Sequence, residues 1–138
     1  MSKEGTGNPA RAMKLGRLLQ ALPEAQLEGS ASVEVSSLAH DSRAVQPGGL
    51  IIALPREKTD GTLYIEDAVR RGAVAVLHEK GVRLPKGVAG LCVEDARGAM
   101  GSLAAEFYGN PSRALRVIGV TGTNGKTTTV FMIRDILK

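Results

Sequence analysis

The stretch Val117-Ile118-Gly119-Val120-Thr121-Gly122-Thr123-Asn124-Gly125-Lys126-Thr127-Thr128 decides the fold class of this chain of 138 residues. Its pattern predicts a strand over 115–120, a tight loop over 121–125 and a helix over 126–137. A strand that runs through small residues into a helix opened by Gly-Lys-Thr is typical of a loop that binds the phosphates of a nucleoside triphosphate.

Each part of this loop has a physical role in binding phosphate. Successive backbone N–H groups turn inward to hold phosphate oxygens, and the first turn of the helix adds positive potential. Lys126 is expected to reach the β- and γ-phosphates as the catalytic lysine, and the Thr127 hydroxyl is expected to ligate Mg²⁺. The expected contacts to the ATP phosphates are Gly122, Thr123, Asn124, Gly125, Lys126, Thr127 and Thr128.

The loop departs from the general pattern G-x-x-x-x-G-K-[ST] at one position. That pattern requires glycine at position 120, where this chain has Val120 and carries Gly122 inside the loop instead. The alternative to a phosphate loop is a Gly-Lys turn that opens an ordinary helix. The order of strand, loop, Gly-Lys-Thr and helix favours the phosphate loop.

Upstream of the loop, short aliphatic runs alternate with helical patterns. Strands are predicted where apolar residues alternate or run together, at 33–37, 50–54, 73–77 and 91–93. Helices are predicted where apolar residues recur at helical spacing, at 14–22, from Ile65 to near Gly72, and from Ala96 to Phe107 behind a cap at Asp95 or Glu94. Strands that alternate with helices pair mostly in parallel, so we predict an α/β fold.

The composition agrees with such a fold and excludes several partners. Hydrophobic residues make up 43% of the chain and aromatic residues only 3%, which indicates a core of Val, Leu, Ile and Ala. The net charge of +4 comes from scattered basic residues, so we expect a solvated surface and no nucleic-acid partner. The alternative is that a few cations face an anionic small molecule.

Two further observations predict the cellular location. No stretch approaches the roughly 18 consecutive apolar residues of a membrane span, and no apolar signal segment stands at the N-terminus, so we expect no membrane partner. The single cysteine, Cys92, lies in an apolar run and is expected to be a buried, inert thiol. We therefore expect a reducing compartment, the cytoplasm.

Polar and turn-forming residues mark two boundaries. Residues 1–13 predict a disordered leader, and Met13 is a second possible start. The run Gly109-Asn110-Pro111-Ser112 breaks the chain after the last upstream helix and predicts a domain boundary near residue 110.

The phosphate loop resembles the ATP-binding loop of the Mur ligases, which build the peptide stem of peptidoglycan. That family has the shifted glycine, so Gly122 agrees with it. Folylpolyglutamate synthases and cyanophycin synthetases share a similar loop, and the N-terminal part decides among them. The stretches that resemble the UDP-binding domain of the muramyl tripeptide and pentapeptide ligases are Asp41-Ser42-Arg43, Pro47-Gly48-Gly49-Leu50-Ile51-Ile52-Ala53-Leu54 and Asp60-Gly61 through Ala75-Val76.

The resemblance covers residues 14–138 and is closer to the tripeptide-forming ligases over Phe107-Tyr108-Gly109-Asn110-Pro111-Ser112 and the phosphate loop. It implies a small N-terminal UDP-binding domain with a mixed or parallel sheet at 14–110. It also implies that the first strand, phosphate loop and helix of an ATP-binding domain lie at 111–138. The implied reaction adds meso-diaminopimelate or L-lysine to UDP-N-acetylmuramoyl-L-alanyl-D-glutamate, with ATP and Mg²⁺ as cofactors and ADP as product.

Carried over by position, the resemblance implies contacts to the UDP part of UDP-N-acetylmuramoyl-dipeptide. The residues implied are His40, Ser42, Glu57, Lys58 and Thr59. The alternative for Asp41-Ser42-Arg43 is a turn closed by a local side-chain-to-backbone hydrogen bond. His40 stands where an aliphatic residue is usual, and Pro55-Arg56 stands where glycine is usual, so this sequence departs from the family at both places.

Mur ligases have three domains, so the resemblance implies that this sequence is the N-terminal fragment of a longer ligase and inactive alone. The acidic Mg²⁺ ligands, the typically carbamylated lysine and the C-terminal domains that bind the amino acid would lie elsewhere in the parent chain. An isolated strand and helix at 115–138 would be marginally stable. The alternatives are a free-standing UDP-sugar-binding module with a vestigial loop, a pentapeptide-forming ligase and, more distantly, a P-loop switch or kinase.

Overall fold

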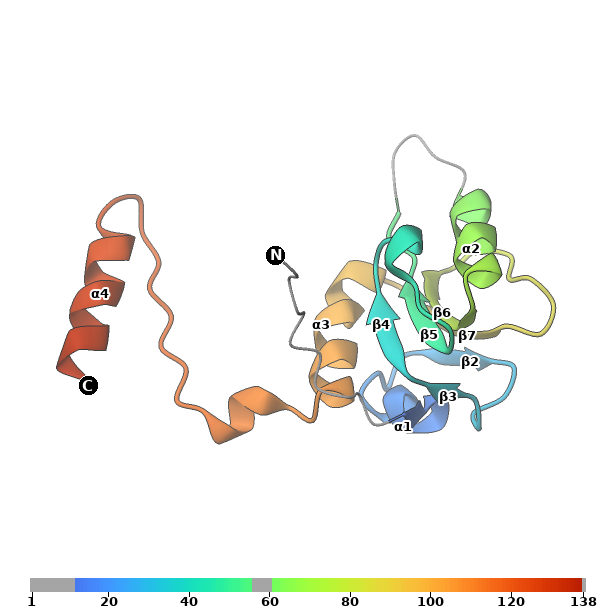
Figure 1. Cartoon of the computed structure of the whole chain (residues 1–138), viewed down its shortest axis with the longest axis horizontal. Coiled ribbons are helices and arrows are strands. Elements are labelled where there is room, and N and C mark those ends of the chain that lie inside the picture. Colours follow the sequence, from blue (N-terminus) through green and yellow to red (C-terminus); the bar gives the residue numbers. More distant parts are fainter. Residues whose placement is uncertain (1–11, 56–60, 138) are drawn as a thin grey trace, which may run out of the picture.

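The computed structural model describes residues 12–55 and 61–137, and its centre is a five-stranded sheet (Figure 1). The strands lie in the order β2 (Gln26–Glu28), β7 (Ala89–Val93), β6 (Ala73–Glu79), β5 (Gly49–Ile52) and β4 (Ser37–Ala39). Strands β4 to β7 are parallel, and β2 is antiparallel to β7. The predicted α/β fold with a mixed sheet is therefore confirmed.

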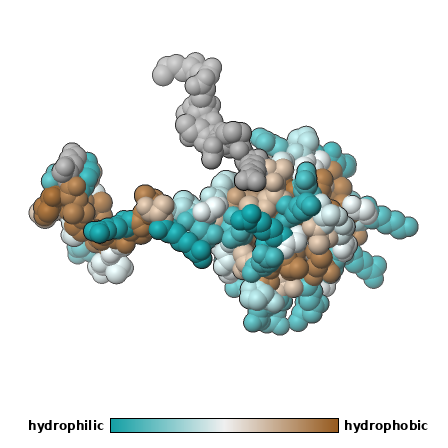
Figure 2. Space-filling view, turned by 90° about the horizontal axis from the view of Figure 1, so that it is seen from below, coloured by the Kyte–Doolittle hydropathy of each residue, from teal (hydrophilic) through white to brown (hydrophobic). Residues whose placement is uncertain are grey.

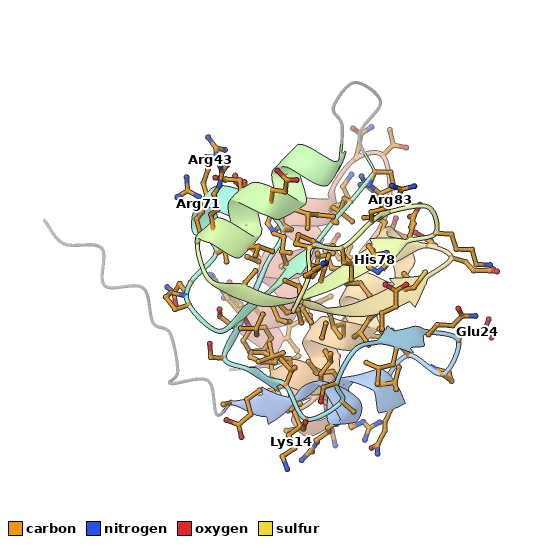
Figure 3. The ribbon with its side chains drawn as sticks, turned by 90° about the vertical axis from the view of Figure 1, so that its right-hand side faces the viewer. Lys14, Glu24, Arg43, Arg71, His78 and Arg83 are labelled. Atoms are coloured by element: carbon orange, nitrogen blue, oxygen red, sulfur yellow. The ribbon has the colours of Figure 1, made fainter. Side chains whose placement is uncertain are left out.

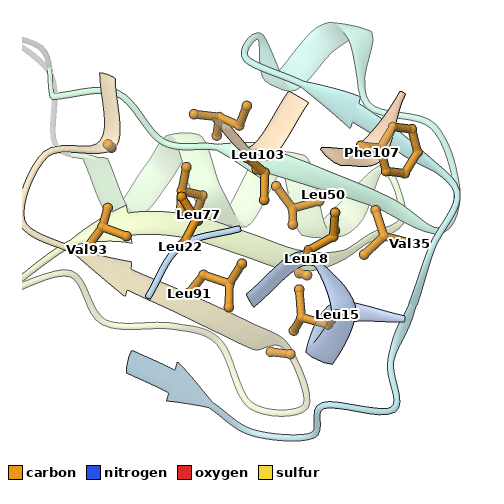
Figure 4. Close-up of a cluster of buried hydrophobic side chains, with 14 residues drawn as sticks. Leu15, Leu18, Leu22, Val35, Leu50, Leu77, Leu91, Val93, Leu103 and Phe107 are labelled. Carbon is orange, nitrogen blue, oxygen red and sulfur yellow. The ribbon is translucent and has the colours of Figure 1, made fainter. Parts of the chain in front are cut away.

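Helices cover both faces of this sheet. Helices α1 (Leu15–Gln20) and α3 (Ala96–Phe107) pack on one face, and α2 (Gly61–Arg70) packs on the other. Along β5, Leu50 and Ile52 point toward α1 and α3, as Figure 4 shows for Leu50, whereas Ile51 points toward α2. A strand buried on both faces must be apolar throughout, which is why the predicted strands read as aliphatic runs.

The helices begin and end close to where the sequence predicts. The Asp95 carboxylate caps α3 by accepting a 3.0 Å hydrogen bond from the backbone N–H of Gly98, as expected of a cap at that position. Helix α1 is shorter than the predicted 14–22, and β6 runs on past Leu77 to Glu79. Among the described residues, no helix combines the length and apolar character that a membrane crossing requires.

The predicted strand over 33–37 is wrong as a single element. It divides into β3 (Glu34–Val35), which pairs with β1 (Met13–Lys14) in a separate two-stranded sheet, and β4, which pairs with β5. At the break, the backbone N–H of Ser36 instead donates to the Gly48 carbonyl at 2.9 Å. Because Met13 pairs with Val35, the disordered leader predicted over 1–13 is also wrong at Met13; residues 1–11 lie outside the described part.

The predicted strand over 115–120 is not formed. After α3 and the short 3-10 turn η2 (Pro111–Ala114), the described chain runs without strand pairing to α4 (Lys126–Ile136), which stands apart from the sheet in Figure 1. A strand needs a neighbouring backbone to complete its hydrogen bonds, and none of the described strands lies beside this segment. The predicted helix over 126–137 is confirmed.

Candidate functional site

The phosphate loop has the backbone shape that its glycines predict. Gly125 precedes the first residue of α4 with φ 78°, in the left-handed region that glycine adopts without steric cost. The turn into the helix therefore depends on glycine at this position. It leaves the first backbone N–H groups of an eleven-residue helix at the loop, where they are free of intrahelical partners.

Two side chains at the start of α4 donate hydrogen bonds to backbone carbonyls of the loop. The Lys126 ammonium donates to the backbone carbonyl of Gly122, so the lysine folds back across the loop. Thr129 Oγ1 donates to the carbonyl of Gly125 at 2.8 Å, one turn into the helix. The lysine contact places a positive charge over the backbone that is expected to hold phosphates.

All of the residues predicted to bind ATP are brought together here. Every residue from 121 to 128 is exposed, so the hydroxyl groups of Thr127 and Thr128 and the backbone N–H groups are accessible to a ligand. An exposed helix N-terminus, a lysine ammonium and a hydroxyl at the second helical position are the donor set that fits a nucleotide phosphate with Mg²⁺. The geometry therefore suits the predicted ligand.

The residues predicted to bind UDP lie at a different place, the carboxyl edge of the sheet. Strands β4 and β5 are parallel neighbours, with Ala39 opposite Ile51, so the residues that follow both strands emerge side by side. Open α/β sheets bind ligands at this edge. His40 directly follows β4 and is exposed, and its backbone carbonyl accepts a hydrogen bond from the Tyr64 hydroxyl of α2.

Ser42 points into the protein rather than into solvent. It opens the 3-10 turn η1 (Ser42–Ala44), is 6% exposed, and hydrogen-bonds the Asp67 carboxylate of α2. This bond, together with the Arg71 guanidinium 3.0 Å from Asp67, lowers the pKa of the Asp67 carboxyl group. Ser42 therefore ties η1 to α2.

The neighbouring Asp41 forms the local turn that the sequence allowed as an alternative. Its Oδ1 accepts from the backbone N–H of Arg43 at 2.9 Å, and its Oδ2 lies 2.7 Å from the Arg43 guanidinium. The hydrogen bond and the negative charge of Asp41 raise the pKa of Arg43. In the view of Figure 3, Arg43 and Arg71 project at the same corner of the molecule, and each guanidinium is paired with a carboxylate, that of Asp41 and that of Asp67.

Three predicted contacts cannot be placed. Glu57, Lys58 and Thr59 lie outside the described residues, between the end of β5 and the start of α2. Two residues that contact His40 and Ser42, namely Tyr64 and Asp67, were not among the predicted site residues. Asp67 carries a signal that could have found it, because Arg70 and Arg71 stand three and four residues later on the same helix face.

Two hollows of the described surface lie away from the ends of β4 and β5. Two open hollows, of about 290 and 360 Å³, lie on the side of α1 and α3. Pro23 and Val93 line the first, and Gln20 and Arg113 line the second. Neither of these two hollows is lined by His40 or Ser42, and the candidate site is described by its chemistry and by its place at the sheet edge.

Comparisons with known proteins agree with this arrangement. A family model described as "Mur ligase family, catalytic domain" matches residues 34–108. A UDP-N-acetylmuramoyl-L-alanyl-D-glutamate–2,6-diaminopimelate ligase of Listeria innocua is 46% identical over 126 residues, which are 91% of this chain and 25% of that protein. The chain thus spans about a quarter of the length of the curated relatives that it matches.

Solved structures show the same fold. A UDP-N-acetylmuramoylalanyl-D-glutamyl-2,6-diaminopimelate–D-alanyl-D-alanyl ligase from Acinetobacter baumannii matches with a TM-score of 0.71 and 28% identity, over 96% of this chain and 29% of that one. The MurF ligase from Thermotoga maritima in complex with ADP matches with a TM-score of 0.52 and 29% identity, over 67% of this chain and 21% of that one.

The family match runs from the start of β3 to the residue after α3, and so contains the parallel strands and the helices α2 and α3 around them. It covers more than half of the chain. The resemblance to the Mur ligases is confirmed by this match, which includes Asp41-Ser42-Arg43, and by the relatives. The chain belongs to the Mur ligase family.

Proposed function

We propose that this chain is the N-terminal part of an ATP-dependent, ADP-forming ligase that adds 2,6-diaminopimelate to UDP-N-acetylmuramoyl-L-alanyl-D-glutamate in peptidoglycan synthesis. The observation that carries the proposal is the 46% identity over 91% of the chain to a relative whose name states that reaction. The names favour diaminopimelate over L-lysine as the added amino acid. The cytoplasmic location stays a prediction.

In this proposal the chain contributes two parts. Residues 14–110 bind the UDP part of the substrate at the carboxyl ends of β4 and β5, and residues 111–138 begin the ATP-binding domain. ATP supplies the phosphoryl group that activates a substrate carboxylate. The loop N–H groups and Lys126 orient and neutralise the phosphates, and the Thr127 hydroxyl would hold Mg²⁺.

Exposed apolar side chains support this division. Val117 is 73% exposed, and on α4 Phe131 is 49% and Ile136 81% exposed, so the phosphate-loop segment presents a surface that water solvates poorly (Figure 2). We propose that these side chains pack against further strands of the ATP-binding domain in the whole ligase. A vestigial loop on a free-standing UDP-sugar module would have no need to keep them apolar.

The second candidate function is that of the pentapeptide-forming ligases. It is favoured by the structural match to the Acinetobacter baumannii ligase, at 28% identity. The tripeptide-forming reaction is preferred because its sequence match is closer, at 46% identity. Supplying the whole ligase with ATP and either UDP-N-acetylmuramoyl-dipeptide plus diaminopimelate or UDP-N-acetylmuramoyl-tripeptide plus D-alanyl-D-alanine separates the two, because the proposal expects ADP release only with the first pair.

The chain of 138 residues should show no ligase turnover by itself. Its phosphate loop is exposed to solvent on every residue from 121 to 128, whereas phosphoryl transfer requires fixed dipoles in a site that excludes water. The measurement is ADP release with UDP-N-acetylmuramoyl-dipeptide, diaminopimelate and ATP. Turnover above background in the pure chain would show that the described groups suffice and would remove this part of the proposal.

Ser42→Ala should weaken the binding of a UDP-sugar by roughly 0.5–1.5 kcal/mol, the net contribution of one neutral hydrogen bond. The substitution can also act indirectly, because Ser42 holds η1 against Asp67 of α2, and its loss would release η1 at the edge of the site. Calorimetry on the chain measures the affinity. Ser36→Ala is the matched control, since Ser36 donates its hydroxyl to the Pro47 carbonyl before β4 begins. An affinity unchanged in Ser42→Ala would remove Ser42 from the site.

The same variant should raise the pKa of Asp67 toward its ordinary value, because the bond from Ser42 is the largest cause of its lowering. A carboxyl group whose pKa is lowered by folding stabilises the protein above its unfolded pKa, and this contribution is lost as the pH falls through the folded value. Ser42→Ala should therefore lose less stability than the parent chain over that acidic range. Carboxyl NMR titration checks the pKa directly.

A further inference from the structure

Three metal-ligating side chains meet near the β2 edge of the sheet, whereas His40 and Ser42 follow β4 at the other edge. Glu28, His78 and Cys92 come from the adjacent strands β2, β6 and β7, and one ligand atom from each lies within 4.8 Å of the others. His78 and Cys92 are register partners. Their neighbours Leu77 and Leu91 point toward α1 and α3, so alternation along the strands directs His78 and Cys92 to the other face.

The imidazole of His78 is set up to use one nitrogen as a ligand. Its Nδ1 lies 2.9 Å from the backbone carbonyl of Glu79, and because a carbonyl only accepts, Nδ1 must carry the proton. The other nitrogen, Nε2, is therefore the one that can bind a metal ion through its lone pair in the neutral ring. His78 is 1% exposed, and Nε2 has no hydrogen-bond partner among the described residues. A buried nitrogen without a partner is costly, and a histidine held by a carbonyl through Nδ1 is typical of metal ligands.

Gly90 provides the space in which these groups meet. A Cβ atom at this position would lie 2.9 Å from His78 Nε2, 2.4 Å from Leu84 Cδ1 and 3.4 Å from Glu28 Cβ. Glycine therefore leaves room between the histidine and the glutamate. Leu84 belongs to the segment between β6 and β7 and helps to screen the cluster, and Figure 3 shows His78 on the side of the sheet where that segment carries Arg83.

We propose that Glu28, His78 and Cys92 bind a divalent transition metal ion that is intermediate between hard and soft, best matched by Zn²⁺. A thiolate, an imidazole and a carboxylate are the ligand types that zinc prefers, and three protein ligands leave a fourth position for water. In a tetrahedral zinc site such atoms lie about 3.3–3.6 Å apart. Glu28 Oε2 is already 3.6 Å from His78 Nε2, and the half-exposed Glu28 side chain can adjust toward Cys92.

Binding of a metal ion would stabilise a weak part of the fold. Strand β2 has only three residues and, among the described strands, forms one edge of the sheet, where it pairs with β7. A metal ion would link β2, β7 and β6 through side chains. The Cys92 thiol loses its proton to solvent as the metal–sulfur bond forms, so binding should tighten as the pH rises. This site is separate from the ATP and UDP sites and does not depend on the proposed function.

Cobalt provides the decisive probe, since a Co²⁺–thiolate bond gives a charge-transfer absorbance and Cys92 is the only cysteine of the chain. We expect the metal-stripped chain of 138 residues to bind one Co²⁺ with that band, to exchange it for Zn²⁺, and to gain thermal stability with Zn²⁺. Cys92→Ser should abolish the band. Glu28→Gln should weaken Zn²⁺ binding by roughly tenfold or more.

Glu24→Gln is the matched control, because Glu24 is an exposed carboxylate close to β2 in the sequence but not in the cluster. It should bind metal like the parent chain. Glu28 is half exposed, so its variant tests the site even if changes at the buried His78 prevent folding. The absence of a thiolate band, a stoichiometry below one per chain, or equal affinity in Glu28→Gln and the parent would each overturn the proposal.

Discussion

Lys126→Ala in the whole ligase should lower kcat by at least about a hundredfold, which corresponds to roughly 2.7 kcal/mol of lost transition-state stabilisation. The ammonium lies over the loop backbone, where it donates to the Gly122 carbonyl, and the α4 N-terminus begins at the same residue. Negative charge on the phosphates shifts as the phosphoryl group is transferred. A cation fixed at that point therefore acts more on the transition state than on substrate binding.

Further substitutions distinguish the effect of the positive charge at position 126 from the effect of the shape of the side chain that carries it. Lys126→Arg should not restore activity, because a planar guanidinium is bulkier than the compact ammonium that folds across the loop. Thr127→Ala should be partly rescued by more Mg²⁺, since its hydroxyl is expected to be a metal ligand. Lys86→Ala, which removes an exposed lysine far from the loop in the sequence, should retain turnover. Steady-state ADP release measures all four, and near-normal turnover in Lys126→Ala would mean that the loop is structural.

Contiguous features of this protein could be predicted from the sequence. All the residues predicted to bind ATP lie within eight positions of the chain, and the start of α4 at Lys126 follows from local chemistry alone. The buried strands β5, β6 and β7 could be predicted because both of their faces are covered, which requires a continuous aliphatic run. In each case, the information lies within a few residues of the structure that it determines.

Features that depend on distant partners could not be predicted in the same way. Val35 and Ser37 look like one alternating strand, but Val35 pairs with Met13 and Ser37 with Gly49. Strand β2 is only three residues long and exists because β7 has a free edge for it. The bond between Ser42 and Asp67 requires that α2 pack over η1.

The cluster of Glu28, His78 and Cys92 could not be predicted from the sequence for the same reason. The apolar run around Cys92 predicts a buried, inert thiol; the exposure of 8% confirms that it is buried, and its inertness stays a prediction. Nothing near Cys92 in the sequence indicates that His78 is its register partner or that β2 brings Glu28 to the same face. The segment at 115–120 shows the opposite case. Its sequence has the pattern of a strand, but no described strand lies beside it to pair with it.

The difference between the sheet and the phosphate-loop segment should also appear in stability. Leu77→Ala should lower the free energy of unfolding by about 2–5 kcal/mol, because Leu77 is wholly buried in the central strand β6 and its truncation leaves a cavity. Ile136→Ala should change it by no more than about 0.5 kcal/mol, since Ile136 is 81% exposed. The chain has no tryptophan, so urea unfolding is best followed by far-ultraviolet circular dichroism.

Hydrogen exchange tests the same contrast without substitution. Amides of β5 and β6 hydrogen-bond within a sheet covered on both faces, so they should exchange only through global unfolding. Amides of α4 should exchange fast, because none of its residues is buried and an isolated helix of eleven residues is marginal in water. Equal protection of α4 and β6 would contradict the division into two parts. In the whole ligase, α4 should become protected, because the proposed ATP-binding domain would then cover Phe131 and Ile136.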